Sequence, residues 1–135
     1  MEDLRQLHTV DADGRIAPIS LRVAGNPGAA ALHARSLERD YGAFTGEDVV
    51  ACLSGLRLRL EADGLLLCCQ GARVNVWPSG QLRQFADGRQ GYVLTRRAPG
   101  QVHEIVDLLD PAPAAQVVSV EDQRRFVYEF HALGL

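Results

Sequence analysis

The fold class depends on residues 45–64, which read TGEDVVACLSGLRLRLEADG. The first four residues form a capping-box pattern, in which the Thr45 oxygen would cover free amides at the start of a helix. At ~100° per residue, the apolar side chains between Val49 and Leu60 fall on one side of such a helix. Gly64 suits the position just after a helix end. These signals favour a helix across most of the stretch.

A second interpretation of the same residues stays open. Residues 56–60 alternate strictly between leucine and arginine, as a half-buried strand does, and Asp63-Gly64 could turn that strand into a hairpin. Gly55 adds weight to this alternative, because an interior glycine costs a helix ~1 kcal/mol relative to alanine. We prefer the helix because its capping pattern and its apolar stripe agree.

The residues before this stretch predict a hairpin followed by a helix. Residues 4–10 and 16–23 are rich in apolar side chains, and Asp13-Gly14 between them is a strong turn signal. Pro18 removes one backbone donor, which suits an edge position or the start of a strand. The alanine-rich residues 28–40 predict a helix that stops near Gly42.

The residues that follow predict an antiparallel meander. Four short segments, at 65–69, 72–77, 81–85 and 91–96, are separated by turns too short to join parallel neighbours. The segment at 81–85 has an alternative, because Ser79 could cap one helical turn that Gly88 ends. Residues 102–109 are apolar enough for a brief helix that ends before Pro111.

A second capping-box pattern, Ser119-Val120-Glu121-Asp122, opens a terminal helix. Together these elements predict one α+β domain over residues 1–135. We expect two layers, with an antiparallel sheet of about five or six strands and about three helices on one face.

Composition restricts the function more than it defines it. The chain has 135 residues and a formal net charge of −3, and all 14 of its basic residues are arginine. Without lysine, Schiff-base chemistry is excluded. An acidic balance argues against nucleic acid as a partner, so we rank it last. The N-terminus lacks a signal-peptide pattern and no apolar run approaches ~18 residues, so we expect a cytoplasmic protein that does not enter a membrane.

The cysteines and histidines suggest neither a metal site nor a disulfide framework. Cys52, Cys68 and Cys69 fit reduced thiols packed in a core. The four histidines are scattered singly, without the spacing of zinc ligands. No nucleotide-binding loop, zinc-protease or esterase motif is present. We therefore expect no metal and no cofactor, and we do not expect an enzyme.

The most suggestive segment for function is residues 69–80. In a strand over residues 72–77, Arg73, Asn75 and Trp77 would share one face, and Arg83 and Tyr92 could join them from neighbouring strands. Arginine and tryptophan are enriched among interface hot spots. The pattern favours a small protein-interaction module, of an accessory, regulatory or immunity type, that binds another protein or itself. An ordinary solvent face with one partly covered tryptophan fits the same pattern.

A rival hypothesis uses overlapping residues for a pocket. Cys69, Arg73, Asn75 and Ser79 could line a cavity with His103, giving a small enzyme or a small-ligand binder. An arginine-bearing pocket would suit a small anionic ligand. This hypothesis requires a thiol of lowered pKa that is accessible to solvent.

Overall fold

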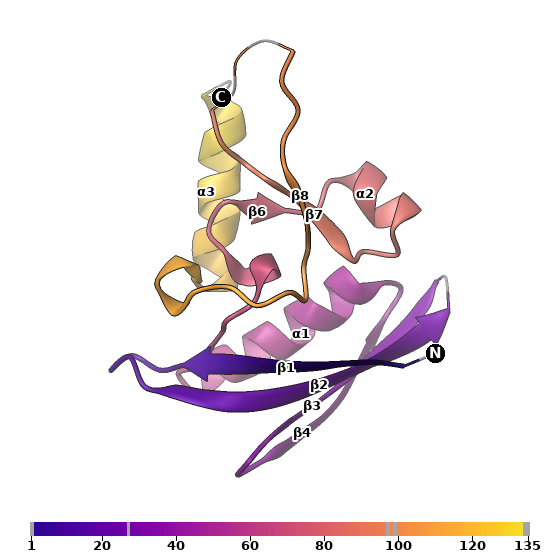
Figure 1. The fold of residues 1–135 in the computed structure, drawn as a ribbon, viewed down its shortest axis with the longest axis vertical. Helices are drawn as coiled ribbons and strands as arrows, with labels where there is room; N and C mark the ends of the chain where they lie inside the picture. Colours follow the sequence, from indigo (N-terminus) through magenta and orange to yellow (C-terminus); the bar gives the residue numbers. More distant parts are fainter. Residues whose placement is uncertain (1, 27, 97, 99, 134–135) are drawn as a thin grey trace.

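The computed structural model describes residues 2–26, 28–96, 98 and 100–133, and within them it confirms the predicted α+β class (Figure 1). The described strands form a five-stranded sheet and a three-stranded sheet. In chain order the elements are β1 (Asp3–Val10), β2 (Ile16–Asn26), β3 (Ala29–Ser36), β4 (Asp40–Gly46), α1 (Val49–Ala62), β5 (Leu66–Leu67), a 3₁₀ turn (Gln70–Ala72), β6 (Val76–Trp77), α2 (Gly80–Phe85), β7 (Gln90–Val93), β8 (Ile105–Asp107), a second 3₁₀ turn (Ala114–Gln116) and α3 (Val120–Ala132).

The five-stranded sheet is antiparallel throughout, in the order β4-β3-β2-β1-β5. The predicted N-terminal hairpin is confirmed, with Leu7 opposite Ile19 and Val10 opposite Ile16. Alternate side chains of the hairpin, including those of Leu7, Ile19 and Leu21, are buried. This alternation fits a sheet that has one face on the core and the other in solvent.

The predicted helix over residues 28–40 is wrong, because these residues form β3, the turn after it and the start of β4. Alanine favours a helix by at most ~0.7 kcal/mol per residue over other ordinary residues. Against that preference, β3 pairs with strands on both sides and buries Leu32 and Ala34 completely. Gly25 permits the close approach of the two strands, since a Cβ there would lie 2.4 Å from the Ala29 oxygen.

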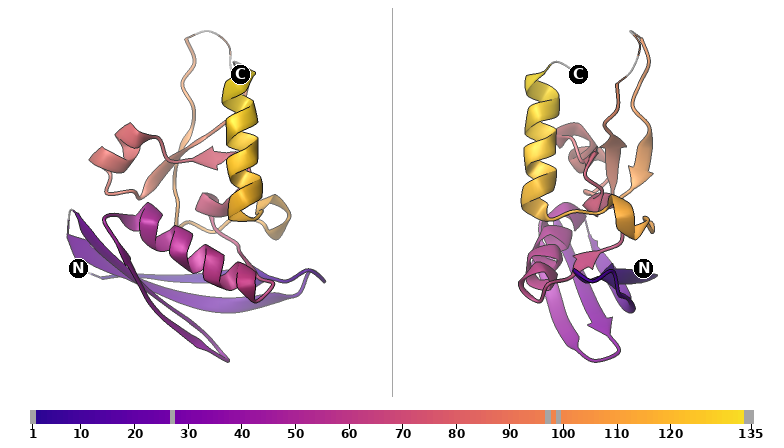
Figure 2. Two further views of the ribbon diagram at one scale, coloured as in Figure 1. Left: turned by 180° about the vertical axis from the view of Figure 1, so that it is seen from behind. Right: turned by 90° about the vertical axis from the view of Figure 1, so that its left-hand side faces the viewer.

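The helical interpretation of residues 56–62 is confirmed by α1, which lies across one face of the five-stranded sheet (Figure 2). The predicted cap is wrong by three residues. Thr45 belongs to β4, and the side chain of Asp48 accepts a 2.9 Å hydrogen bond from the Ala51 amide instead. Gly64 follows the helix end with a φ of 76°, as the sequence predicted.

The predicted meander is correct only in part. Residues 66–67 form β5, which pairs with β1 in the first sheet, and residues 70–72 form a 3₁₀ turn. Ser79 caps the short helix α2, so the alternative for residues 81–85 holds. Of the four predicted segments in the described part of the chain, only two pair with each other, as β6 and β7. The strand expected over residues 72–77 shortens to β6 because the Arg73 amide bonds locally to the Gln70 carbonyl, 3.1 Å away.

The brief helix expected over residues 102–109 is also wrong, because residues 105–107 form β8 and pair with β7. Pairing with β7 places the following Leu108 and Leu109 fully inside the main core. The hydrogen bonds to β7 give residues 105–107 the backbone partners that a helix would otherwise provide.

The terminal helix is confirmed as α3, whose cap residue Ser119 accepts a hydrogen bond from the Asp122 amide at 3.1 Å. Helix α3 runs beside the three-stranded sheet, and its N-terminal end approaches α1 (Figure 2). Its Val127 and Phe130 form a second apolar cluster with Leu94, against which Trp77, Tyr92 and Phe126 pack. None of the helices in the described part of the chain is long and apolar enough to cross a membrane.

A buried polar contact joins α1 to α3. Arg57 on α1 is only 5% exposed, and its Nη1 donates to Gln123 Oε1 at 2.6 Å. The same guanidinium donates to the carbonyls of Gly71 at 3.1 Å and Val118 at 2.9 Å. Gln123 Nε2 in turn lies 2.8 Å from the Gly71, Arg73 and Val76 carbonyl oxygens. These bonds connect both helices to the segment that precedes β6.

We expect Gln123→Ala to lower the free energy of unfolding by about 3 kcal/mol, because it removes an acceptor of a buried guanidinium and takes one donor away from three carbonyl oxygens. Denaturant unfolding of wild type and variant measures this loss. Gln116→Ala, at an exposed glutamine, is the control and should change the value by less than ~0.5 kcal/mol. Equal stabilities of the two variants would contradict a structural role for the Gln123 amide.

Candidate functional site

The predicted stripe of arginine, asparagine and aromatic side chains does not form a single exposed face. Arg73 turns back, so that its Nη1 donates to Gln70 Oε1 at 2.7 Å. Asn75 Nδ2 donates to the Leu94 carbonyl at 3.3 Å. Trp77 and Tyr92 are cross-strand partners, but they are half-buried against the apolar cluster of α3. The single face does not form, because side chains alternate between two faces only in a strand. Residues 70–72 form a 3₁₀ turn, and residues 73–75 connect that turn to β6.

The pocket expected around Cys69, Ser79 and His103 is not assembled either, because the three side chains have different surroundings. Cys69 is fully buried in the main core. The Ser79 oxygen accepts a hydrogen bond from the Leu82 amide at 3.1 Å and so caps α2. The His103 ring packs against Tyr92, with ring centres 5.8 Å apart, on the second cluster.

The cysteines are buried thiols. Burial raises the pKa of Cys69 to about 11, and the nearby Arg57 guanidinium offsets only part of this effect. Burial also raises the pKa of Cys52 and of Cys68. Within the described residues, no three His, Cys, Asp or Glu side chains are grouped closely enough to hold a metal ion. The structure therefore offers no activated thiol among these three positions.

We expect iodoacetamide to modify the native thiols far more slowly at neutral pH than the same thiols in guanidinium chloride, because raised pKa and burial act together. Mass spectrometry over time measures the modification at Cys52, Cys68 and Cys69. Rapid modification of native Cys69 would contradict this expectation and revive the thiol-based hypothesis.

A cavity of about 420 Å³ lies between α1, α2, β6 and the start of α3. It contains Trp77 and Arg83, two of the residues that the sequence singled out, but its other polar groups come from elsewhere in the chain. We call it the arginine cleft, because three arginines line it: Arg57 from α1, Arg83 from α2 and Arg124 from α3. Its apolar wall includes Val50, Leu53, Leu108 and Val120.

Arg57 brings a buried positive charge to the arginine cleft. Its acceptors are two backbone carbonyls and a side-chain amide, all neutral. Among the described residues it forms no ion pair with a carboxylate, although Glu61 lies near enough to act on it through space. Burial lowers the pKa of Arg57, and Cys69 and Glu61 partly oppose that shift. An arginine with only neutral acceptors keeps its full charge beside the cleft.

Arg83 is held at the cleft by an ion pair with two hydrogen bonds. Its Nε donates to Asp48 Oδ2 at 2.8 Å and its Nη2 to Asp48 Oδ1 at 3.0 Å. Asp48 is the buried cap residue of α1, so one carboxylate both starts that helix and anchors α2. Burial alone would raise the pKa of Asp48, but the bonds from Arg83 and from the Ala51 amide outweigh it, and the pKa is lowered.

Arg124 supplies the most accessible charge of the three. It is exposed on α3, and in the described part of the chain its guanidinium has no carboxylate partner. The next residue, Arg125, differs because it lies 3.5 Å from Glu121 and 3.9 Å from Asp122. The arginine cleft thus carries three guanidinium groups, and Asp48 neutralises only one of them.

Sequence reasoning missed Arg57, Gln123 and Arg124 as parts of the site. One feature of the sequence pointed to Arg57. It flanks the apolar stripe of α1, where a buried charged side chain needs hydrogen-bond partners inside the protein. Arg124 belongs to the basic pair Arg124-Arg125, which could clamp a phosphate or a carboxylate, but the sequence favours surface salt bridging for it. Its position at the cleft depends on how α3 packs against α1.

Comparisons with known proteins do not assign the chain to a group. No protein-family model matches it, and a search of curated proteins found no sequence match. The chemistry of the cleft therefore has to be argued from its own residues.

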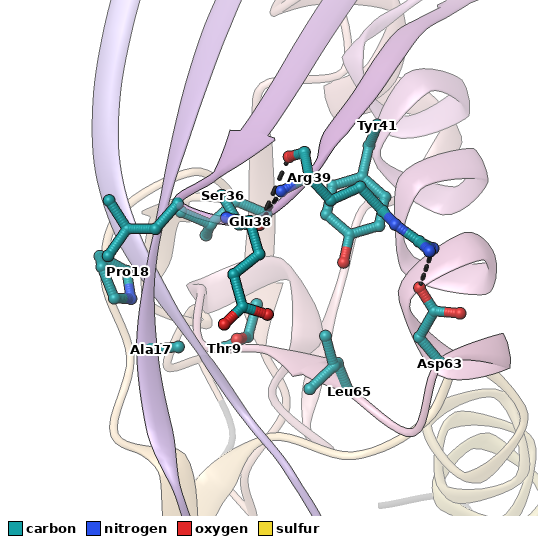
Figure 3. A pocket seen from close by; sticks show the side chains of 11 residues that line it. Thr9, Ala17, Pro18, Ser36, Glu38, Arg39, Tyr41, Asp63 and Leu65 are labelled. Carbon is teal, nitrogen blue, oxygen red and sulfur yellow. Dashed lines mark hydrogen bonds and ion pairs between the residues drawn. The ribbon is translucent and has the colours of Figure 1, made fainter.

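A second cavity, of about 440 Å³, lies at the other end of α1 (Figure 3). The starts of β2 and β5, the turn between β3 and β4, and the end of α1 surround it. Arg39 reaches from that turn to α1, where its Nη1 donates to Asp63 Oδ2 at 2.9 Å. Arg59 Nη1 lies 3.0 Å from Asp63 Oδ1, so one carboxylate holds two arginines.

We expect the ion pair between Asp48 and Arg83 to make the free energy of unfolding fall at acidic pH. Because the pKa of Asp48 is lowered on folding, its carboxylate stabilises the fold above the unfolded value of ~3.9, and this stabilisation is lost as the pH falls through the folded value. Asp48→Asn keeps a good cap residue but loses the charge, and should cost about 1–2 kcal/mol at neutral pH.

Urea unfolding at a series of pH values measures the difference between wild type and Asp48→Asn. The difference should be constant above pH ~5 and should shrink below pH ~4. Asp13→Asn, at an exposed turn residue, is the matched control and should cost little at any pH. A difference for Asp48→Asn that does not change with pH would contradict the ion-pair explanation.

Proposed function

We propose that the protein binds a small anionic molecule in the arginine cleft. The observation that carries this proposal is the buried guanidinium of Arg57, which has only neutral acceptors and lies beside Arg83 and Arg124 in one cavity. Guanidinium groups bind carboxylates and phosphates through paired, charge-assisted hydrogen bonds. An anion in the cleft would supply the carboxylate or phosphate partner that Arg57 and Arg124 lack among the described residues.

The size and lining of the cleft support a small ligand with an apolar body. Its volume of about 420 Å³ lies in the range of ~300–1,000 Å³ that is typical of ligand sites. Val50, Leu53 and Leu108 provide an apolar wall, and Trp77 adds an aromatic surface. A carboxylate or phosphate carried on an apolar or planar body would use both parts of this lining.

The chemistry of the lining supports binding rather than reaction. In the described residues that form the cleft, the polar side chains are three arginines, Ser54 and Gln123. Arginine remains protonated and does not act as a general base. The amide of Gln123 is already committed to Arg57 and to three carbonyl oxygens. We therefore propose a binding protein and not an enzyme.

Trp77 provides a direct test, because it is the single tryptophan of the chain and lines the cleft. Titration with phenyl phosphate and with benzoate, followed by intrinsic fluorescence, should give a saturable change that phenol does not give. Arg124→Gln should weaken binding about tenfold, the effect of losing one charge-assisted contact. Arg124 is exposed, so the variant should fold normally.

Arg125→Gln is the matched control, because it removes the same charge from the adjacent position, where the side chain faces Glu121 and Asp122. It should leave the affinity unchanged. Equal weakening by both variants would mean that the anions respond to overall charge, and an unsaturable or absent fluorescence change would overturn the proposal.

A protein-interaction module is the second candidate, and the exposure of Phe85 favours it. This side chain is 78% exposed on α2, two residues after Arg83. A large exposed apolar side chain beside an arginine is a combination found at interfaces. A partner that presents a carboxylate to Arg83 and an apolar side chain to Phe85 would bind at the mouth of the cleft. Saturation of the Trp77 signal by a small anion distinguishes the two candidates in favour of the first.

A further inference from the structure

The cavity of Figure 3 divides its polar groups into two sets. One set is fully engaged, because Asp63 pairs with Arg39 and with Arg59. Both guanidinium groups also lie near the Tyr41 ring, at 5.8 Å and 5.6 Å from its centre. These contacts hold both cations close to the Tyr41 ring and leave the Asp63 carboxylate paired with two arginines.

The other set consists of three oxygen-bearing groups with no hydrogen-bond partner among the described residues: the Glu38 carboxylate and the hydroxyls of Thr9 and Tyr41. Figure 3 shows the Glu38 carboxylate and the Tyr41 hydroxyl turned into the cavity, while Arg39 extends away toward Asp63. Thr9 is only 4% exposed and lines this cavity. All three groups can accept hydrogen bonds, and the carboxylate carries a charge.

The rest of the cavity is apolar. Ala17, Pro18 and Ile19 from β2 form one wall, and Leu65 lies across from them (Figure 3). An apolar lining with a few convergent acceptors suits a ligand that has an aliphatic body and a donating, positively charged end.

We propose that this cavity binds a primary ammonium group on a short aliphatic stem. The ammonium group would pair with the Glu38 carboxylate and donate to the Tyr41 and Thr9 hydroxyls, because it carries three donors and no acceptor. Its stem would lie along Pro18 and Leu65. Arg39 and Arg59 together carry one positive charge more than Asp63 neutralises, and both side chains are about half exposed, so solvent screens that charge.

The chain contains no lysine, so the side chains of a second copy cannot supply this group. The ammonium group comes either from a free alkylamine or from a lysine side chain of a different protein. Both sources present a primary ammonium group on an aliphatic stem, and probes that resemble either source distinguish them.

Amide chemical shifts of the full chain, followed during titration with n-butylammonium, test the proposal. Residues around Thr9, Glu38 and Leu65 should shift saturably, and n-butanol and butyrate should bind at least about tenfold more weakly. Glu38→Gln should weaken n-butylammonium binding about tenfold, and Tyr41→Phe should weaken it less. Glu129→Gln, which removes a charge from exposed α3, should have no effect.

Nα-acetyl-lysine methylamide provides the second arm. Binding at least as tight as that of n-butylammonium indicates a lysine of another protein, and clearly weaker binding indicates a free amine. Equal binding of n-butanol and n-butylammonium, or an unchanged affinity in Glu38→Gln, would overturn the proposal. Trp77 fluorescence, which reports on the arginine cleft, should not respond to the amine, so the two proposals fail separately.

Discussion

The contact between Arg57 and Gln123 is the constraint on which the arrangement of the two sheets depends. A buried guanidinium must satisfy its donors inside the protein, and here the acceptors come from α3 and from two stretches of backbone. Because α1 lies on the first sheet and α3 beside the second, this contact fixes how the two layers meet. The arginine cleft opens at that junction, so Arg57 both stabilises the fold and brings a positive charge to the cleft.

A cluster of ion pairs at another edge holds the same two layers together. Arg5 on β1 contacts Asp107 and Asp110, which flank the end of β8, at 3.1 Å and 2.7 Å. Asp3 pairs with Arg5 and also with Arg89, just before β7. These side chains are partly exposed, so each ion pair contributes little to stability by itself. Because the pairs share residues, they stabilise the contact between the layers as a network. With both junctions held, a ligand in the arginine cleft would meet side chains that are already in place.

Sequence patterns correctly predicted the elements that are held by hydrogen bonds between residues close in sequence. The Asp-Gly turn of the first hairpin, the Ser119 cap of α3 and the Ser79 cap of α2 each depend on residues within a few positions of one another. The alanine-rich strand β3 was missed because its conformation comes from pairing with β2 and β4, and pairing is invisible to helix propensity. Of the predicted site residues, Trp77 and Arg83 line the arginine cleft, whereas Arg73 and Asn75 bond to their own neighbourhood.

The sequence by itself predicted the α+β class, excluded lysine chemistry and favoured a helix over a strand for residues 56–62, because these follow from composition and short-range pattern. Only the tertiary structure decided which arginines gather. Arg57 meets Gln123 across 66 positions of the chain, and Arg83 meets Asp48 across 35. The sequence singled out Arg83, but no local pattern pairs it with Asp48 or pairs Arg57 with Gln123, because burial required partners from distant segments.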